Sequence, residues 1–312
     1  MTCERLTCCY SPVTEEPGLA PRCDDLRMTT PAGFLSEEHQ LRWTTATYQV
    51  RACDLALAGA ADPQPGSFMQ LADTGYPWEK VSVWSRSYLT SGIEHMMLWA
   101  DLVAPYAFED GHINQVRFLP YLLMGRAGLE SGAHAVWLLE PSDPRDCVRR
   151  FVRMMYKDFG YQRKAREAGG RSAEKIVARM QDLVNRCEEF GVGLSPKDKP
   201  PGYEGLVKAA ASAVGGDPER WAYLWNAASG AAHGQNWFGL EGYDVELGDE
   251  YEPGHFRSTR IPDGSYITEV MEAAADTLRW GAWRWLDLCG YDAQALMTDA
   301  IAHIHARMPK KD

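Results

Sequence analysis

The sequence lacks a long hydrophobic run. No stretch of eighteen or more apolar residues is free of charge, so we expect no transmembrane helix and no membrane partner. The first residues, MTCERLTCCYSPVTEEPGLAPRCDD, also lack the basic-then-apolar order of a secretory signal peptide. Together these absences lead us to expect a cytoplasmic protein.

Motifs of catalysis and metal binding are also missing. The chain has no Gly-x-Ser-x-Gly elbow, no phosphate-binding glycine loop and no His-Glu-x-x-His sequence. Its cysteines match no zinc-knuckle spacing: four lie singly in helical patterns, as core cysteines do, and four crowd the N-terminal segment (Cys53, Cys147, Cys187, Cys289; Cys3, Cys8, Cys9, Cys23). We therefore expect neither a metal nor another cofactor.

Strand signals are nearly absent, whereas helical periodicity is widespread. Apolar residues make up 45% of the chain and include 11 Trp and 14 Tyr, enough for a sizeable core. The pattern predicts an all-α fold, a single multi-helix bundle over 35–312. Residues 1–34 show no apolar periodicity, so we expect a flexible N-terminal arm there. The segment 242–256 has a weak hairpin pattern, but its Gly, Pro and acidic residues favour a loop.

Charge is unevenly distributed. The net charge of −11 argues against a protein coated with nucleic acid. However, residues 149–179 contain ten Lys and Arg against three acids, and residues 241–252 contain six acids and no base. The predicted helix over 144–168 carries Arg149, Arg150 and Arg153, which we expect to contact phosphate groups of a substrate.

The predicted helix over 116–139 places Arg126, Glu130 and His134 four residues apart, along one stripe. One interpretation is an ion pair that only fixes helix register inside the bundle. The other is a catalytic group in which the pair orients a ligand, or orients the imidazole as an acid or base. A charged pair on so apolar a helix needs polar partners. In the first interpretation the partners are side chains of neighbouring helices, and in the second they include a ligand.

The predicted helix over 217–233 carries a second polar stripe of Tyr223, Asn226, Ser229 and His233. This stripe is either a small-residue packing contact with a helix-end histidine, or the mouth of a pocket with substrate-binding side chains and a catalytic His233. Because polar stripes in a bundle interior need each other, we expect this helix to pack on the one that carries Arg126. Glu130, His134 and His233 would then be close enough to hold a metal, but the sequence has none of the usual ligand repeats.

These residues carry a family resemblance. Arg126-x-x-x-Glu130, the Trp-Leu-Leu-x-Pro run at 137–141, the basic helix, and the spaced Tyr223, Ser229 and His233 resemble a family of uncharacterised bacterial all-helical proteins, distantly related to HEPN-type and abortive-infection proteins. The resemblance implies a helical bundle, often dimeric, and metal-independent ribonuclease activity in a defence or toxin system. HEPN sites use an Arg and a His four to six residues apart on one helix. Here no Arg lies within seven residues before His233, so Arg126 would have to supply it.

Three functions follow. The leading hypothesis is a HEPN-like protein that acts on RNA or a nucleotide, for example as a ribonuclease, with Arg126, Glu130, His134 and His233 as catalytic residues. The second is a non-catalytic interaction protein, in which the basic helix meets an acidic surface of a protein partner or of a second copy in a homodimer. The third is a metal- or small-molecule-dependent helical enzyme.

Overall fold

The computed structural model describes residues 35–106, 116–195, 197 and 199–308. These residues are mostly helical, which confirms the predicted helical character of the chain. The predicted N-terminal arm, 1–34, lies outside the described residues.

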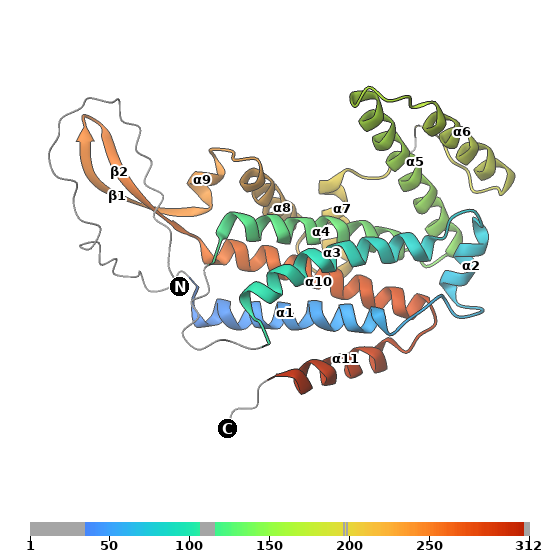
Figure 1. The fold of residues 1–312 in the computed structure, drawn as a ribbon, viewed down its shortest axis with the longest axis horizontal. Helices are drawn as coiled ribbons and strands as arrows, with labels where there is room; N and C mark the ends of the chain where they lie inside the picture. Colours follow the sequence, from blue (N-terminus) through green and yellow to red (C-terminus); the bar gives the residue numbers. More distant parts are fainter. Residues whose placement is uncertain (1–34, 107–115, 196, 198, 309–312) are drawn as a thin grey trace.

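Four long helices form the body of the molecule. Helix α4 (Phe118–Leu139) packs between α3 (Val81–Val103) and α10 (Gly264–Leu288), and α1 (Glu37–Ala58) covers α10 and α3 (Figure 1). Helix α11 (Ala293–Arg307) lies against the outer side of α1. The packing is close at glycines: a Cβ on Gly132 of α4 would lie 2.8 Å from Thr277 Cγ2 of α10. Because glycine has no side chain, the helix axes can approach closely at these positions.

Two pairs of helices extend this body. Helices α7 (Tyr203–Val214) and α8 (Pro218–Ala232) pack against α4. Helices α5 (Pro144–Ala168) and α6 (Glu174–Glu189) project from the body as an antiparallel pair, with α2 (Phe68–Gly75) at the base of α5 (Figure 1). The site described below lies where α4, α5 and α7 approach one another.

The helix boundaries follow from their capping residues. The Ser36 side chain accepts a hydrogen bond from the His39 N–H at the start of α1, and Asp217, followed by Pro218, caps α8 in the same way. The left-handed Gly215 (φ +88°) ends α7. The short helices α2 and α9 (Phe238–Glu241) were not predicted, because so few residues show no periodicity.

The loop predicted for residues 242–256 is wrong. Strands β1 (Tyr243–Glu252) and β2 (His255–Pro262) form an antiparallel hairpin that projects from the body at the end opposite α5 and α6 (Figure 1). Pro253 and Gly254 make its tight turn, with Gly254 at φ +77°. Most of the hairpin is exposed on both faces, and its acidic residues, Gly and Pro resemble those of a loop.

Candidate functional site

The predicted Arg126–Glu130 pair on α4 forms, and it has a third member. Glu130 Oε1 accepts hydrogen bonds from Arg126 Nε at 2.8 Å and from Trp225 Nε1 of α8 at 2.7 Å. Each side chain of the ion pair is 20% exposed, and the Arg126 guanidinium also lies 5.9 Å from the Trp225 ring centroid. One carboxylate therefore joins α4 to α8, and the predicted packing of these two helices is confirmed.

His134, one turn beyond Glu130, has its ring fixed on three sides. Its Nδ1 lies 2.7 Å from the Glu130 carbonyl oxygen. The Tyr88 ring of α3 stacks on the imidazole at 5.0 Å between centroids, and Tyr203 of α7 meets it edge-on at 5.5 Å. A carbonyl oxygen only accepts, so Nδ1 carries the proton and the neutral ring presents Nε2 as an acceptor. Burial lowers the pKa of His134, which keeps the ring neutral at pH 7.

A pocket of about 220 Å³ opens beside this ring; we call it the His134 pocket. It is lined by residues from α3, α4, α5 and α7 (Tyr88, Glu130, Ser131, His134, Met154, Lys157, Asp158, Tyr161, Tyr203). Lys157 Nζ donates to the Pro201 carbonyl oxygen at 3.0 Å, and it lies 5.7 Å from the Tyr203 ring centroid. Burial lowers the pKa of Lys157. The pocket thus combines an imidazole, a partly desolvated ammonium and exposed phenol rings.

The predicted residues of α8 lie elsewhere. Asn226 Nδ2 donates to the Ala222 carbonyl and Ser229 Oγ to the Trp225 carbonyl, so both side chains bond within their own helix. The Tyr223 hydroxyl donates to Glu241 Oε2 at 3.0 Å. His233 is the exposed C-cap of α8, and its side chain bonds to no other described residue. Of the residues predicted for one common pocket, only Glu130 and His134 line the His134 pocket.

The predicted phosphate contacts on α5 lie near its N-terminus. Arg149 pairs with Asp146 at 2.6 Å, and Arg150 pairs with Glu140 and donates to the Trp137 carbonyl at 2.7 Å. Together with Arg153 they line an open polar depression at the α4–α5 corner. Neighbouring acids therefore offset the charges of Arg149 and Arg150.

Most residues of the site were not predicted, among them Tyr88, Lys157, Tyr203 and Trp225. Trp225 lies four residues before Ser229, on one face of the same helix, and this spacing was the available signal. Tyr88, Lys157 and Tyr203 belong to three other helices. No sequence spacing relates them to His134, because only the packing order of the helices brings them together.

Within the described part of the chain, no group of three or more His, Cys, Asp or Glu side chains converges in a way that would hold a metal ion. No helix there is both long enough and apolar enough to cross a membrane. Comparison with protein-family models, curated proteins and solved structures found no match to this chain.

Proposed function

We propose that this protein binds RNA or a nucleotide at the His134 pocket and cleaves RNA there without a metal, as the HEPN resemblance implies. The observation that carries the proposal is the pairing of a neutral His134, with Nε2 as acceptor, and the Lys157 ammonium in one pocket. The positive charge of Lys157 itself helps to lower the pKa of His134, so the two groups interact. The geometry favours His134 over the exposed His233 as the catalytic histidine.

The two groups suit the transfer of a phosphoryl group within RNA. His134 Nε2 accepts the proton of a ribose 2′-hydroxyl, whose oxygen forms a bond to the adjacent phosphorus. The bond from phosphorus to the 5′-oxygen breaks, and Lys157 gives its proton to that leaving oxygen. Because burial lowers the pKa of Lys157, its ammonium is a stronger acid than a solvated lysine. The products are a 2′,3′-cyclic phosphate and a 5′-hydroxyl.

The rim of the pocket has surfaces for bases and phosphates. Tyr161 and Tyr203 are 48% and 41% exposed, and exposed phenol rings stack on nucleobases. The charge of Lys157 is available to a phosphate at the pocket, and Arg149 and Arg153 lie further along the same helix towards its N-terminus. The carboxylate of Asp158 also lines the pocket, and the charge of Arg179 partly offsets it.

A binding titration tests the proposal. Wild-type protein should retain labelled single-stranded RNA at low salt, and the affinity should fall steeply as salt rises, because bound phosphates release counterions. Lys157→Met should weaken binding about tenfold, the cost of one charge-assisted contact. The matched control is Lys164→Met, an exposed lysine on the same helix but outside the pocket, which should change affinity by less than about threefold. Equal losses in both variants, or no retention of RNA by the wild type, would refute a site at this pocket.

A specific observation favours a second function, a non-catalytic interaction protein. The projecting hairpin carries acidic residues on β1 and exposes Val245, Leu247 and Phe256, which are 43%, 69% and 44% exposed. A two-stranded hairpin is only marginally stable alone, and the unpaired backbone groups at its edge are satisfied when a strand of a partner pairs with it. The basic helix α5 of a second copy is one surface of opposite charge. Analytical ultracentrifugation distinguishes this function from RNA cleavage. If the hairpin forms a dimer contact, the wild type should be dimeric and Leu247→Lys should be monomeric.

A further inference from the structure

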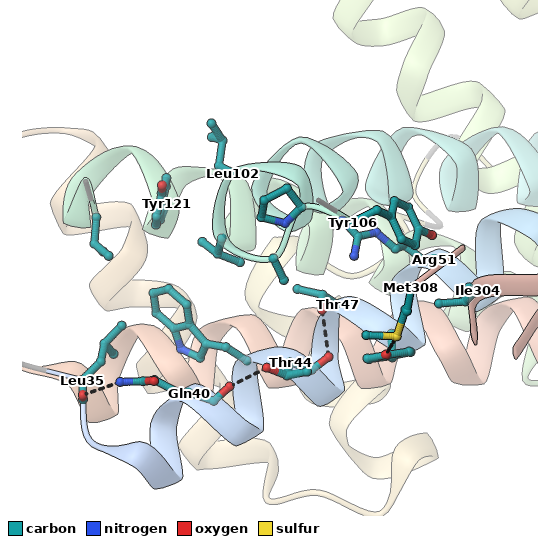
Figure 2. A pocket seen from close by; sticks show the side chains of 16 residues that line it. Leu35, Gln40, Thr44, Thr47, Arg51, Leu102, Tyr106, Tyr121, Ile304 and Met308 are labelled. Carbon is teal, nitrogen blue, oxygen red and sulfur yellow. Dashed lines mark hydrogen bonds between the residues drawn. The ribbon is translucent and has the colours of Figure 1, made fainter. Parts of the chain in front are cut away.

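We infer that a second pocket, remote from the His134 pocket, binds a small carboxylic acid with an apolar body. The pocket has a volume of about 370 Å³ and lies between α1, the end of α3, the start of α4 and the end of α11 (Figure 2). Its volume falls within the range of small-molecule sites, which begins at about 300 Å³. The inference is independent of the proposed reaction, because the two pockets share no residue.

The walls of this pocket are mainly apolar. Leu35, Val103, Pro105, Val116 and Ile304 line it from four separate segments. Trp43 is 5% exposed and donates its indole N–H to Thr268 Oγ1 at 2.8 Å, so its polar atom is already satisfied. Such walls favour a hydrocarbon or aromatic body and exclude a strongly hydrated one.

One end of the pocket holds a buried cation with a free donor. The Arg51 side chain is 5% exposed, and both of its hydrogen bonds to described residues use Nη2, to the Ala100 carbonyl oxygen and to Asp101 Oδ1 at 2.9 Å. Nε is buried and has no partner among the described residues. A buried guanidinium with an unsatisfied donor is costly, and a ligand carboxylate at this end of the pocket would stabilise its positive charge.

The charge around Arg51 favours an anionic oxygen. Arg51 and Arg307 lie over the Tyr106 ring, 4.4 Å and 4.3 Å from its centroid, and Arg51 and Tyr106 lie side by side in Figure 2. Asp101 balances one of these two cations and is 62% exposed. A carboxylate would balance the second and match the planar guanidinium, with charge-assisted hydrogen bonds.

The α1 wall adds acceptors rather than donors. Thr44 and Thr47 donate their hydroxyls to the carbonyl oxygens of Gln40 and Thr44, as the dashed lines in Figure 2 show. Gln40 Nε2 donates to the Leu35 carbonyl oxygen at 3.2 Å. With these donors engaged inside the protein, the carboxylate belongs at the Arg51 end and the apolar body along α1.

Dye displacement tests the inference on the full chain. The probe is 8-anilinonaphthalene-1-sulfonate, an aromatic anion whose fluorescence rises in an apolar site. We expect saturable binding and displacement by octanoate at concentrations at least tenfold lower than octylammonium, which has the same body and the opposite charge. In Arg51→Met the affinity for octanoate should fall about tenfold, and that for octan-1-ol less than threefold.

A pair of neighbouring residues supplies the control for location. Thr44 lines the pocket, whereas Thr45, also exposed on α1 and bonded to its own helix in the same way, does not. Thr44→Trp should fill the pocket and lower dye binding at least tenfold, and Thr45→Trp should leave it unchanged. The inference is overturned if the wild type shows no saturable binding, if Thr44→Trp binds like Thr45→Trp, or if octylammonium displaces the dye as well as octanoate.

Discussion

The Arg126–Glu130 ion pair on α4 has a third partner, Trp225, because of what the Glu130 carboxylate requires. A half-buried carboxylate with only Arg126 beside it would keep unsatisfied acceptor capacity, and Trp225 has an indole N–H that also needs an acceptor. Both requirements are met at one oxygen atom, Oε1. The Arg126, Glu130 and Trp225 side chains therefore stabilise the α4–α8 contact. They also fix the turn of α4 in which the Glu130 carbonyl oxygen orients His134.

Removal of this carboxylate should be costly. Glu130→Ala leaves the Arg126 charge and the Trp225 N–H without their acceptor, so we expect a loss of about 2–4 kcal/mol in the free energy of unfolding. Urea denaturation measures it. The control is Glu219→Ala, which breaks the exposed Lys208–Glu219 pair and should change the free energy of unfolding far less. A Glu130→Ala cost as small as that of the control would contradict the structural role.

The buried imidazole makes stability depend on pH. Burial lowers the pKa of His134 in the folded protein, whereas the unfolded chain titrates near pH 6.5. Below that value the unfolded state binds more protons, so this contribution to stability is lost as pH falls through about 6.5. The unfolding midpoint measured at pH 7.5 and pH 5.5 should therefore drop more in the wild type than in His134→Gln. A drop in His134→Gln equal to that of the wild type would exclude this contribution.

At the scale of helices, close packing in the body depends on glycine. A Cβ at Gly132 would meet Thr277 Cγ2 at 2.8 Å and Leu278 Cδ2 at 3.2 Å, both on α10. Gly132→Ala should therefore lower the free energy of unfolding by about 1–3 kcal/mol, because α4 and α10 must move apart. Gly160, inside α5, has nothing within 4 Å of its Cβ position.

Gly160→Ala is the control for this prediction. It should stabilise the protein by about 0.5–1 kcal/mol, the helix preference of Ala over Gly. Thermal or chemical denaturation compares the two variants directly. If Gly132→Ala were also stabilising, the close α4–α10 contact would be wrong.

Secondary structure could be predicted from the sequence wherever one helix face is buried. The helices over α1, α3, α4, α5, α8 and α10 follow from apolar periodicity, and Ser36 and Asp217 mark two of their starts. The hairpin could not be predicted, since β1 buries no face and its acidic residues resemble those of a loop. Helices and strands can therefore be predicted from the sequence only where burial of one face gives the apolar residues a regular spacing.

At the scale of the whole molecule, the arrangement of helices decides the candidate site. Arg126, Glu130 and His134 could be found in the sequence because one helix carries them. Lys157, Tyr88 and Tyr203 could not, because α5, α3 and α7 reach His134 only through tertiary packing. His233 was predicted from its position after Ser229, but the end of α8 places it in solvent, away from the His134 pocket.

Charge is also arranged across the whole molecule. The basic pair α5–α6 and the acidic hairpin project from opposite ends of the body (Figure 1). A polyanion should therefore approach the α5 end, where the His134 pocket opens, despite the net charge of −11. Charge reversal of Arg149, Arg150 and Arg153 should lower affinity for all RNA sequences alike, because contacts to phosphate carry no sequence information. Gel-shift titrations with two unrelated RNAs measure this; a loss confined to one RNA would contradict it.

The central claim is that His134, and not His233, is the catalytic base. The most direct test compares variants of the two histidines in a cleavage assay on single-stranded RNA, with EDTA in the buffer to remove metal ions. Wild-type protein and His233→Ala should cut the RNA and leave 2′,3′-cyclic phosphate ends. His134→Asn should retain RNA with similar affinity but cut it at least 100-fold more slowly, because a general base acts mainly in the transition state. Cleavage by His134→Asn at the wild-type rate, or its loss only in His233→Ala, would contradict the account.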